Sequence, residues 1–75
     1  MPVSKMEADN MLIWVGTGIA QRRKFAGLSC SQLARRSHLK TDVIHRLESG
    51  EHDLSLRELY AIARGLGATL GEMLH

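Results

Sequence analysis

An all-α fold is predicted by three features of this 75-residue sequence. Proline occurs once and β-branched residues are few, which favours helix over sheet. No segment shows the apolar–polar alternation of a strand. Residues 29–32, 55–58 and 69–72 each pair a serine or threonine with a later glutamine or glutamate, as a capping box does. These boxes predict helix starts near residues 30, 56 and 70.

Length and composition allow one small domain and exclude several classes of protein. A chain of 75 residues buries only about 60% of its unfolded surface, which leaves little room for a deep catalytic cavity. The single cysteine, Cys30, excludes an internal disulfide, so we expect a cytoplasmic protein. The most apolar run, residues 11–20, has about half of the roughly 20 residues that cross a bilayer.

The first helix is predicted over residues 11–26, where Leu12, Val15 and Ile19 share one face. Residues 1–9 lack apolar periodicity and are expected to form a flexible N-terminal arm, followed by a single domain over residues 10–75. Gly27 then ends the first helix.

Four shorter helices are predicted over residues 30–37, 41–49, 56–66 and 70–74. Gly50 and Gly67 follow the third and fourth of the five helices as end signals. The side chains expected to face the core are Leu33, Ala34, Val43, Ile44, Leu47, Leu59, Ile62, Ala63 and Leu66. Gly65 lies inside a helix at a cost of about 1 kcal/mol relative to alanine, which indicates close packing there.

Only residues 37–40 lie between the second and third helices, and helices joined by so short a turn cross steeply. This is the geometry of a helix-turn-helix. Such turns often use glycine at positive φ, and here His38 is expected to adopt that conformation at some cost in strain.

The net charge of +2 conceals a strong separation of charge along the chain. Residues 21–46 hold seven basic side chains and one acidic side chain, a net charge of +6. The rest of the chain holds three basic and seven acidic side chains, a net charge of −4. A basic pole of this size indicates a polyanion as partner, because lysine and arginine near phosphates release condensed counterions.

A known family shares the order and spacing of three groups of residues. The groups are Gly27, Leu28, Ser29, Gln32, Leu33 and Ala34, then Ile44, Leu47, Glu48 and Gly50, then Leu59, Ile62, Ala63, Leu66 and Gly67. Over residues 16–74 the chain resembles the Cro and phage-repressor type of helix-turn-helix DNA-binding domain, also described as xenobiotic-response-element-like. The resemblance implies a compact, lambda-repressor-like bundle of five helices, with the third helix in the DNA major groove.

The same resemblance implies an ion pair between Arg23 of the first helix and Glu48 of the third. Three positions depart from the family pattern. His38 replaces the turn glycine, Ser37 replaces an apolar residue, and Lys40 replaces a capping serine or threonine. Either Lys40 begins the third helix without a cap or Thr41 caps it.

Inward-facing apolar residues of the third helix leave Thr41, Asp42, His45 and Arg46 on its outer side as expected base contacts. The family's base-reading positions correspond to Thr41, Asp42 and Arg46, with His45 beside them. The expected phosphate contacts are Cys30 and Ser31 at the start of the second helix, with Arg35, Lys40 and Ser49 flanking the groove.

The sequence therefore predicts a sequence-specific regulator of transcription that binds double-stranded DNA, of repressor or restriction-modification controller type. We expect a homodimer on a palindromic operator, autoregulatory if that operator is its own, with a dimer patch of Leu66, Leu70, Met73 and Leu74. The alternative is an antitoxin or similar module that neutralises a partner protein, with the apolar first helix and Trp14 as its surface.

Other chemistry has weak support in the sequence. His38, His45 and His52 are seven residues apart, which is not the ligand spacing of a zinc site, so no metal is expected. No group of residues has the pattern of a catalytic site, so we expect neither a cofactor nor enzyme activity. Cys30 near arginines fits either a redox sensor with a lowered pKa or, as we favour, an unreactive thiol.

Overall fold

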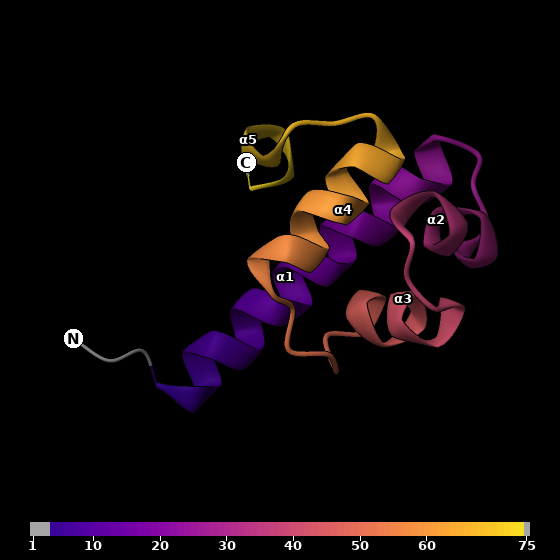
Figure 1. Ribbon diagram of the computed structural model, residues 1–75. Helices are drawn as coiled ribbons and strands as arrows, with labels where there is room; N and C mark the ends of the chain where they lie inside the picture. Colours follow the sequence, from indigo (N-terminus) through magenta and orange to yellow (C-terminus); the bar gives the residue numbers. More distant parts are fainter. Residues whose placement is uncertain (1–3, 75) are drawn as a thin grey trace.

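The computed structural model describes residues 4–74, and within that range it contains five helices and no strand. The helices are α1 (Lys5–Phe25), α2 (Cys30–Ser37), α3 (Thr41–Glu48), α4 (Leu56–Leu66) and α5 (Leu70–Met73). Figure 1 shows the long helix α1 behind α4, with α2 and α3 on one side of α4 and α5 on the opposite side. The predicted all-α class with five helices is confirmed for this part of the chain.

Helix α1 begins six residues earlier than the periodicity predicts, at Lys5 rather than Met11. The Ser4 hydroxyl accepts a hydrogen bond of 3.1 Å from the backbone N–H of Glu7 and so caps the helix. Every residue from 4 to 11 is exposed, so this part of α1 carries no apolar stripe that a sequence pattern reveals. The predicted helix start at residue 11 is thus wrong, whereas a flexible arm over residues 1–9 stays a prediction, and residues 1–3 lie outside the described range.

The three predicted capping boxes are all present with both of their hydrogen bonds. They begin α2, α4 and α5 at residues 30, 56 and 70, as the sequence predicts. The last turns are shorter than expected, since α3 ends at Glu48 and α5 at Met73. A capping box therefore predicts its helix start to the residue, whereas the predicted helix ends differ from the structure by at most one residue.

The core lies where α2 packs against α3 and α4 and where α1 packs against α3 and α5. Its largest fully buried side chains are Ile19, Leu33, Ile44 and Ile62. Gly65 permits the close contact of α4 with α2, because a Cβ there would lie 2.6 Å from Ser37 Oγ and 3.2 Å from Leu33 Cδ1. A bulkier residue would separate the two helices.

No helix in the described range is both long enough and apolar enough to span a bilayer.

Candidate nucleic-acid interface

Helix α3 has one side fixed in the core and one side in solvent. Ile44 is fully buried and Leu47 is 3% exposed, whereas Asp42, His45 and Arg46 are exposed and Thr41 is half-buried. The residues predicted to read bases thus lie along the outer side of α3. Because eight helical residues extend about 12 Å, this side has the length to enter a major groove with its N-terminal end.

The inner side of α3 is held against α1 through a glycine. Gly16 is buried, and a Cβ on this residue would collide with the carbonyl oxygen of Leu47. The two helix backbones therefore approach at a distance that only glycine allows. The sequence pattern did not lead us to predict that Gly16 positions α3. Its spacing is a signal, however, since it follows Leu12 by four residues and precedes Ile19 by three on the apolar face of α1.

A second link between α1 and α3 is the ion pair of Arg23 and Glu48. Arg23 donates from Nε to Oε2 at 2.6 Å and from Nη2 to Oε1 at 3.0 Å, and both side chains are 12% exposed. Arg23 Nη1 also donates to the carbonyl oxygen of Leu28 at 2.8 Å, which ties the end of α1 to the same network. The hydrogen bonds to Glu48 raise the pKa of Arg23 and outweigh the opposing effect of burial. Such a two-pronged contact fixes both the direction and the rotation of α3.

Cys30 lies beside this ion pair, with Sγ 3.9 Å from each carboxylate oxygen of Glu48. Burial, and then the negative charge of Glu48, raise the pKa of the Cys30 thiol despite the opposing charge of Arg23. A raised pKa keeps the sulfur in its unreactive thiol form at neutral pH. A redox sensor would need a lowered thiol pKa, so that interpretation of Cys30 is wrong.

The turn between α2 and α3 is formed as the sequence predicts. His38 ends α2 in the left-handed region at φ 56°, and the N–H of Leu39 donates to the carbonyl oxygen of Ala34 at 2.9 Å. Lys40 is the N-cap of α3, and its side chain makes no capping hydrogen bond within the described range. The alternative with Thr41 as the cap is therefore wrong, since Thr41 is already the first helical residue.

Two of the predicted base-contacting residues are paired with each other. Arg46 Nη2 lies 3.2 Å from Asp42 Oδ2, one helical turn away, and the two side chains are 50% and 74% exposed. An exposed pair of this kind is worth less than about 1 kcal/mol. The guanidinium can therefore exchange Asp42 for a base edge at small cost, while Asp42 restrains it in the free protein.

The predicted phosphate contacts fall into two groups around α3. At the start of α2, the capping box occupies the N–H groups of Ser29 and Gln32, which leaves those of Cys30 and Ser31 without an acceptor among residues 4–74. Arg35 and Lys40 are exposed, while Ser49 follows the far end of α3. The Ser49 hydroxyl lies 3.1 Å from the carbonyl oxygen of His45 and 3.2 Å from that of Arg46, so its proton is already engaged.

A family comparison bears directly on this geometry. The helix-turn-helix domain family matches residues 14–75, which is most of the chain. The chain belongs to the helix-turn-helix domain family. Together with the exposed outer side of α3, this membership makes it a DNA-binding transcriptional regulator.

Solved structures of similar fold agree with this family assignment. The chain is similar to the restriction-modification controller protein C.AhdI from Aeromonas hydrophila, with 26% identity, a TM-score of 0.83, and coverage of 85% of this chain and 97% of that one. It is similar to a tyrosine-to-phenylalanine mutant of the restriction-modification controller protein C.Esp1396I, with 29% identity, a TM-score of 0.78, and coverage of 84% of each chain. The clp gene regulator ClgR from C. glutamicum shares the fold at 22% identity and a TM-score of 0.81, with coverage of 99% of this chain and 87% of that one. No curated protein matches the sequence significantly.

The dimer patch predicted for this helix-turn-helix domain is only partly on its surface. Met73 is 7% exposed and belongs to the core, because α5 turns it inward against the bundle. Leu66 and Leu70 are half-buried, and Leu74 is 51% exposed. The placement of Met73 is thus a correction to the sequence prediction.

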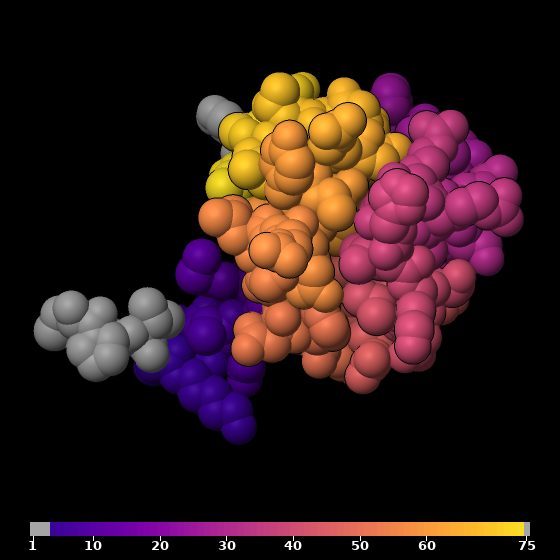
Figure 2. Space-filling view, in the orientation of Figure 1, coloured from indigo at the N-terminus to yellow at the C-terminus, as the bar shows by residue number. Residues whose placement is uncertain are grey.

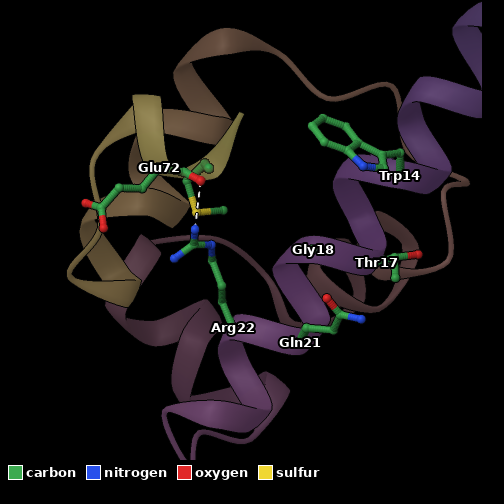
Figure 3. Close-up of a pocket in the computed structure, with 7 residues that line it drawn as sticks. Trp14, Thr17, Gly18, Gln21, Arg22 and Glu72 are labelled. Atoms are coloured by element: carbon green, nitrogen blue, oxygen red, sulfur yellow. Dashed lines mark hydrogen bonds between the residues drawn. The ribbon is translucent and has the colours of Figure 1, made fainter. Parts of the chain in front are cut away.

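A polar cleft of the same domain lies on α1 and α5, away from the outer side of α3. Figure 3 shows Trp14, Thr17 and Gln21 around it, with Arg22 reaching toward Glu72. Arg22 Nη2 donates to the carbonyl oxygen of Glu72 at 2.7 Å. This bond joins the short helix α5 to α1.

Proposed function

We propose that this regulator recognises a specific DNA sequence by placing the outer side of α3 in the major groove. One observation carries the proposal: α3 is fixed by Gly16 and by the Arg23–Glu48 pair on its inner side, while its outer side is exposed. A rigidly held helix presents its side chains to base edges in one register. The unoccupied N–H groups at the start of α2 then bind the phosphate backbone beside it.

The outer residues divide the work between bases and phosphates. Arg46 donates two hydrogen bonds to the O6 and N7 atoms of a guanine, and Asp42 accepts one from a cytosine amino group. Thr41, at the N-terminal end of α3, presents its methyl group to a thymine. Lys40 contacts phosphate, as do Cys30 and Ser31 through their backbone N–H groups.

This division is tested by fluorescence anisotropy with duplexes from the upstream region of the gene and with random duplexes. Arg46→Ala is expected to reduce the difference in binding free energy between upstream and random duplexes by about 1–3 kcal/mol, while it retains much of the affinity for random duplexes. Lys40→Ala is expected to weaken all duplexes equally and to lower the slope of log affinity against log salt by about one. If the two variants behave alike, the division between base and phosphate contacts is wrong.

We further propose that the regulator binds as a homodimer on two half-sites about 34 Å apart. An apolar groove of about 310 Å³ supports this proposal, since Leu74 lines it together with Met11 of α1 and Leu56 of α4, all of them exposed. The likeness to two restriction-modification controller proteins supports a controller of that type. Sedimentation at micromolar concentration tests the dimer, and a Leu56→Lys variant that remains dimeric would exclude this groove as the interface.

A second candidate function is the neutralisation of a partner polypeptide, such as a toxin. It is supported by Ile13 and Trp14, which are 51% and 52% exposed on α1. Failure of the purified chain to bind duplexes from its own upstream region in dilute buffer would favour this function over the first.

A further inference from the structure

A basic cleft of about 500 Å³ lies between the C-terminal end of α2 and the outer side of α4. The residues that line it are Arg36 and Ser37 of α2, His38 directly after α2, and Arg57, Tyr60 and Arg64 of α4. Figure 2 shows the side chains of α4 beside those of α2 on this face of the molecule. None of the residues predicted to contact DNA bases or phosphates lines this cleft.

The cleft carries three positive charges and no acidic side chain. Arg36, Arg57 and Arg64 are exposed, and among residues 4–74 none of them takes part in an ion pair or a side-chain hydrogen bond. Arg57 and Arg64 are seven residues apart on α4 and so lie on one side of that helix, about 10 Å from each other along its axis. Arg36 faces them from α2. The three guanidinium groups are therefore free to converge on a common anion.

The floor of the cleft includes a buried hydroxyl group without a partner. Ser37 is 3% exposed, and its Oγ has no hydrogen-bond partner among the described residues. Gly65 of α4 packs directly against it, since any Cβ there would lie 2.6 Å from Ser37 Oγ. This hydroxyl therefore lies in the contact between α2 and α4, and the cleft is defined by the arginine side chains around it.

The local backbone field opposes an anion only weakly. The C-terminal end of α2 carries about half a negative charge, whereas the three guanidinium groups together carry three positive charges. Each guanidinium offers paired N–H donors that match the oxygens of a phosphate group. Half-exposed Tyr60 adds a hydroxyl donor and a flat ring face at the rim.

We propose that this cleft binds a small ligand with two or more phosphate groups. Arg57 and Arg64 begin about 10 Å apart along α4, so a chain of phosphates meets more than one guanidinium group without the side chains having to bend toward one point, as they must for a single phosphate. The volume lies in the range of about 300–1,000 Å³ that is usual for small-molecule sites, and a concave site between two helices suits a compact ligand better than a rod-like duplex. This ligand site is separate from the residues predicted to contact DNA.

The experiment is isothermal titration calorimetry of the full chain without DNA, at constant ionic strength, with inorganic tripolyphosphate and orthophosphate as probes. We expect saturable binding of one tripolyphosphate per chain and much weaker binding of orthophosphate. The double variant Arg57→Gln/Arg64→Gln is expected to weaken tripolyphosphate binding by about tenfold or more. The matched control Lys5→Gln/Lys24→Gln removes the same charge from exposed positions outside the cleft and is expected to change binding by less than about twofold.

Arg Nε–H signals in NMR spectra identify the site without relying on the variants. Tripolyphosphate is expected to shift the signals of Arg36, Arg57 and Arg64 more than that of Arg35, which is exposed but does not line the cleft. Equal losses in the double variant and in its control, or no saturation at millimolar probe, would reduce the interaction to general charge attraction and overturn the proposal.

Two further outcomes would assign the arginines to another ligand. If tripolyphosphate fails to bind while Arg57→Gln/Arg64→Gln lowers the DNA salt slope by about two, these residues contact the DNA backbone instead. If a hexaglutamate peptide binds as tightly as tripolyphosphate and is lost in the same variant, the cleft recognises carboxylates. Either result overturns the phosphate-ligand site and leaves recognition by α3 intact, because the latter is measured separately with Arg46→Ala.

Discussion

The two sides of α3 each carry an arginine–carboxylate pair, yet the pairs differ in every property that matters. On the inner side, Arg23 and Glu48 come from different helices, are 12% exposed and meet through two hydrogen bonds. On the outer side, Arg46 and Asp42 lie on the same helix and are at least half exposed. The two pairs thus hold the same kinds of charge. They differ in their burial and in whether they join two helices, and these differences decide the role of each pair.

The inner pair acts on the structure and the outer pair on recognition. Removing one partner of a largely buried pair leaves an uncompensated charge in a poor solvent, which is costly. Removing one partner of an exposed pair costs little, because water replaces it. The comparison predicts that inner-side variants change the free energy of unfolding, whereas outer-side variants change binding to DNA.

The largest effect is expected for Gly16→Ala. Its Cβ would collide with the carbonyl oxygen of Leu47, a backbone atom that moves only with α3 itself. We expect a loss of about 3 kcal/mol in the free energy of unfolding, measured by urea denaturation. Gly18→Ala is the matched control on the same helix. A Cβ at Gly18 meets nothing within 4 Å, so this variant is expected to gain about 0.5–1 kcal/mol. Similar losses in both variants would mean that α1 and α3 are not in close contact.

The next effect is expected for Glu48→Gln, which places an amide N–H₂ group against the Arg23 guanidinium. We expect a loss of about 2 kcal/mol in the free energy of unfolding, less than for a fully buried pair because some solvent reaches these groups. The variant is also expected to lower the pKa of Cys30, whose thiol loses the nearby negative charge, and so to speed its reaction with a disulfide reagent. Exposed Glu51→Gln is the control. Unchanged thiol reactivity would show that Glu48 does not raise the pKa of Cys30.

A smaller effect of opposite sign is expected for His38→Gly. Glycine adopts φ 56° without the steric cost of an L side chain in that conformation. We therefore expect the free energy of unfolding, measured by thermal unfolding, to rise by about 0.5 kcal/mol. Gly67→Ala tests the reverse change at φ 70°, with no atom within 4 Å of the new Cβ, and is expected to lose about 1 kcal/mol. DNA affinity is expected to stay within about twofold for His38→Gly, because the inner contacts fix α3. A large change would show that the turn itself aims the helix.

Much of this organisation is predictable from local sequence. The capping boxes predict three helix starts because the side chain of the serine or threonine accepts from the backbone N–H of the later glutamine or glutamate, whose own side chain accepts from the backbone N–H of the first residue. His38 at positive φ follows from the length of the turn. The pairing of Arg46 with Asp42 is also visible in the sequence, since residues four apart on a helix are neighbours, although only the structure shows that two expected base contacts restrain each other.

The remaining features depend on tertiary packing. The burial of Met73 depends on the direction that α5 takes after Thr69, which no periodicity in a four-residue helix reveals. The first turns of α1 have no apolar stripe, and only the Ser4–Glu7 spacing signals their start. The role of Gly16 needs two helices in contact, and a single sequence shows only one of them.

The smallest effect on stability, and the sharpest test of the comparison, is expected for Asp42→Asn. The exposed pair with Arg46 contributes little, so the free energy of unfolding is expected to change by less than about 0.5 kcal/mol. Asp42 is the acidic residue within the basic segment 21–46, and its loss removes repulsion of the DNA backbone.

Affinity of Asp42→Asn for random duplexes at low salt is therefore expected to rise about threefold, with a lower ratio of specific to non-specific binding. Anisotropy titrations at two salt concentrations measure both quantities, with Glu51→Gln as a charge-matched control outside the basic segment. If Asp42→Asn destabilises the fold as much as Glu48→Gln, then the outer pair also holds α3 and the separation of structure from recognition on this helix is wrong. If stability is unchanged and discrimination falls, a single carboxylate on the outer side of α3 limits non-specific binding without any part in the fold.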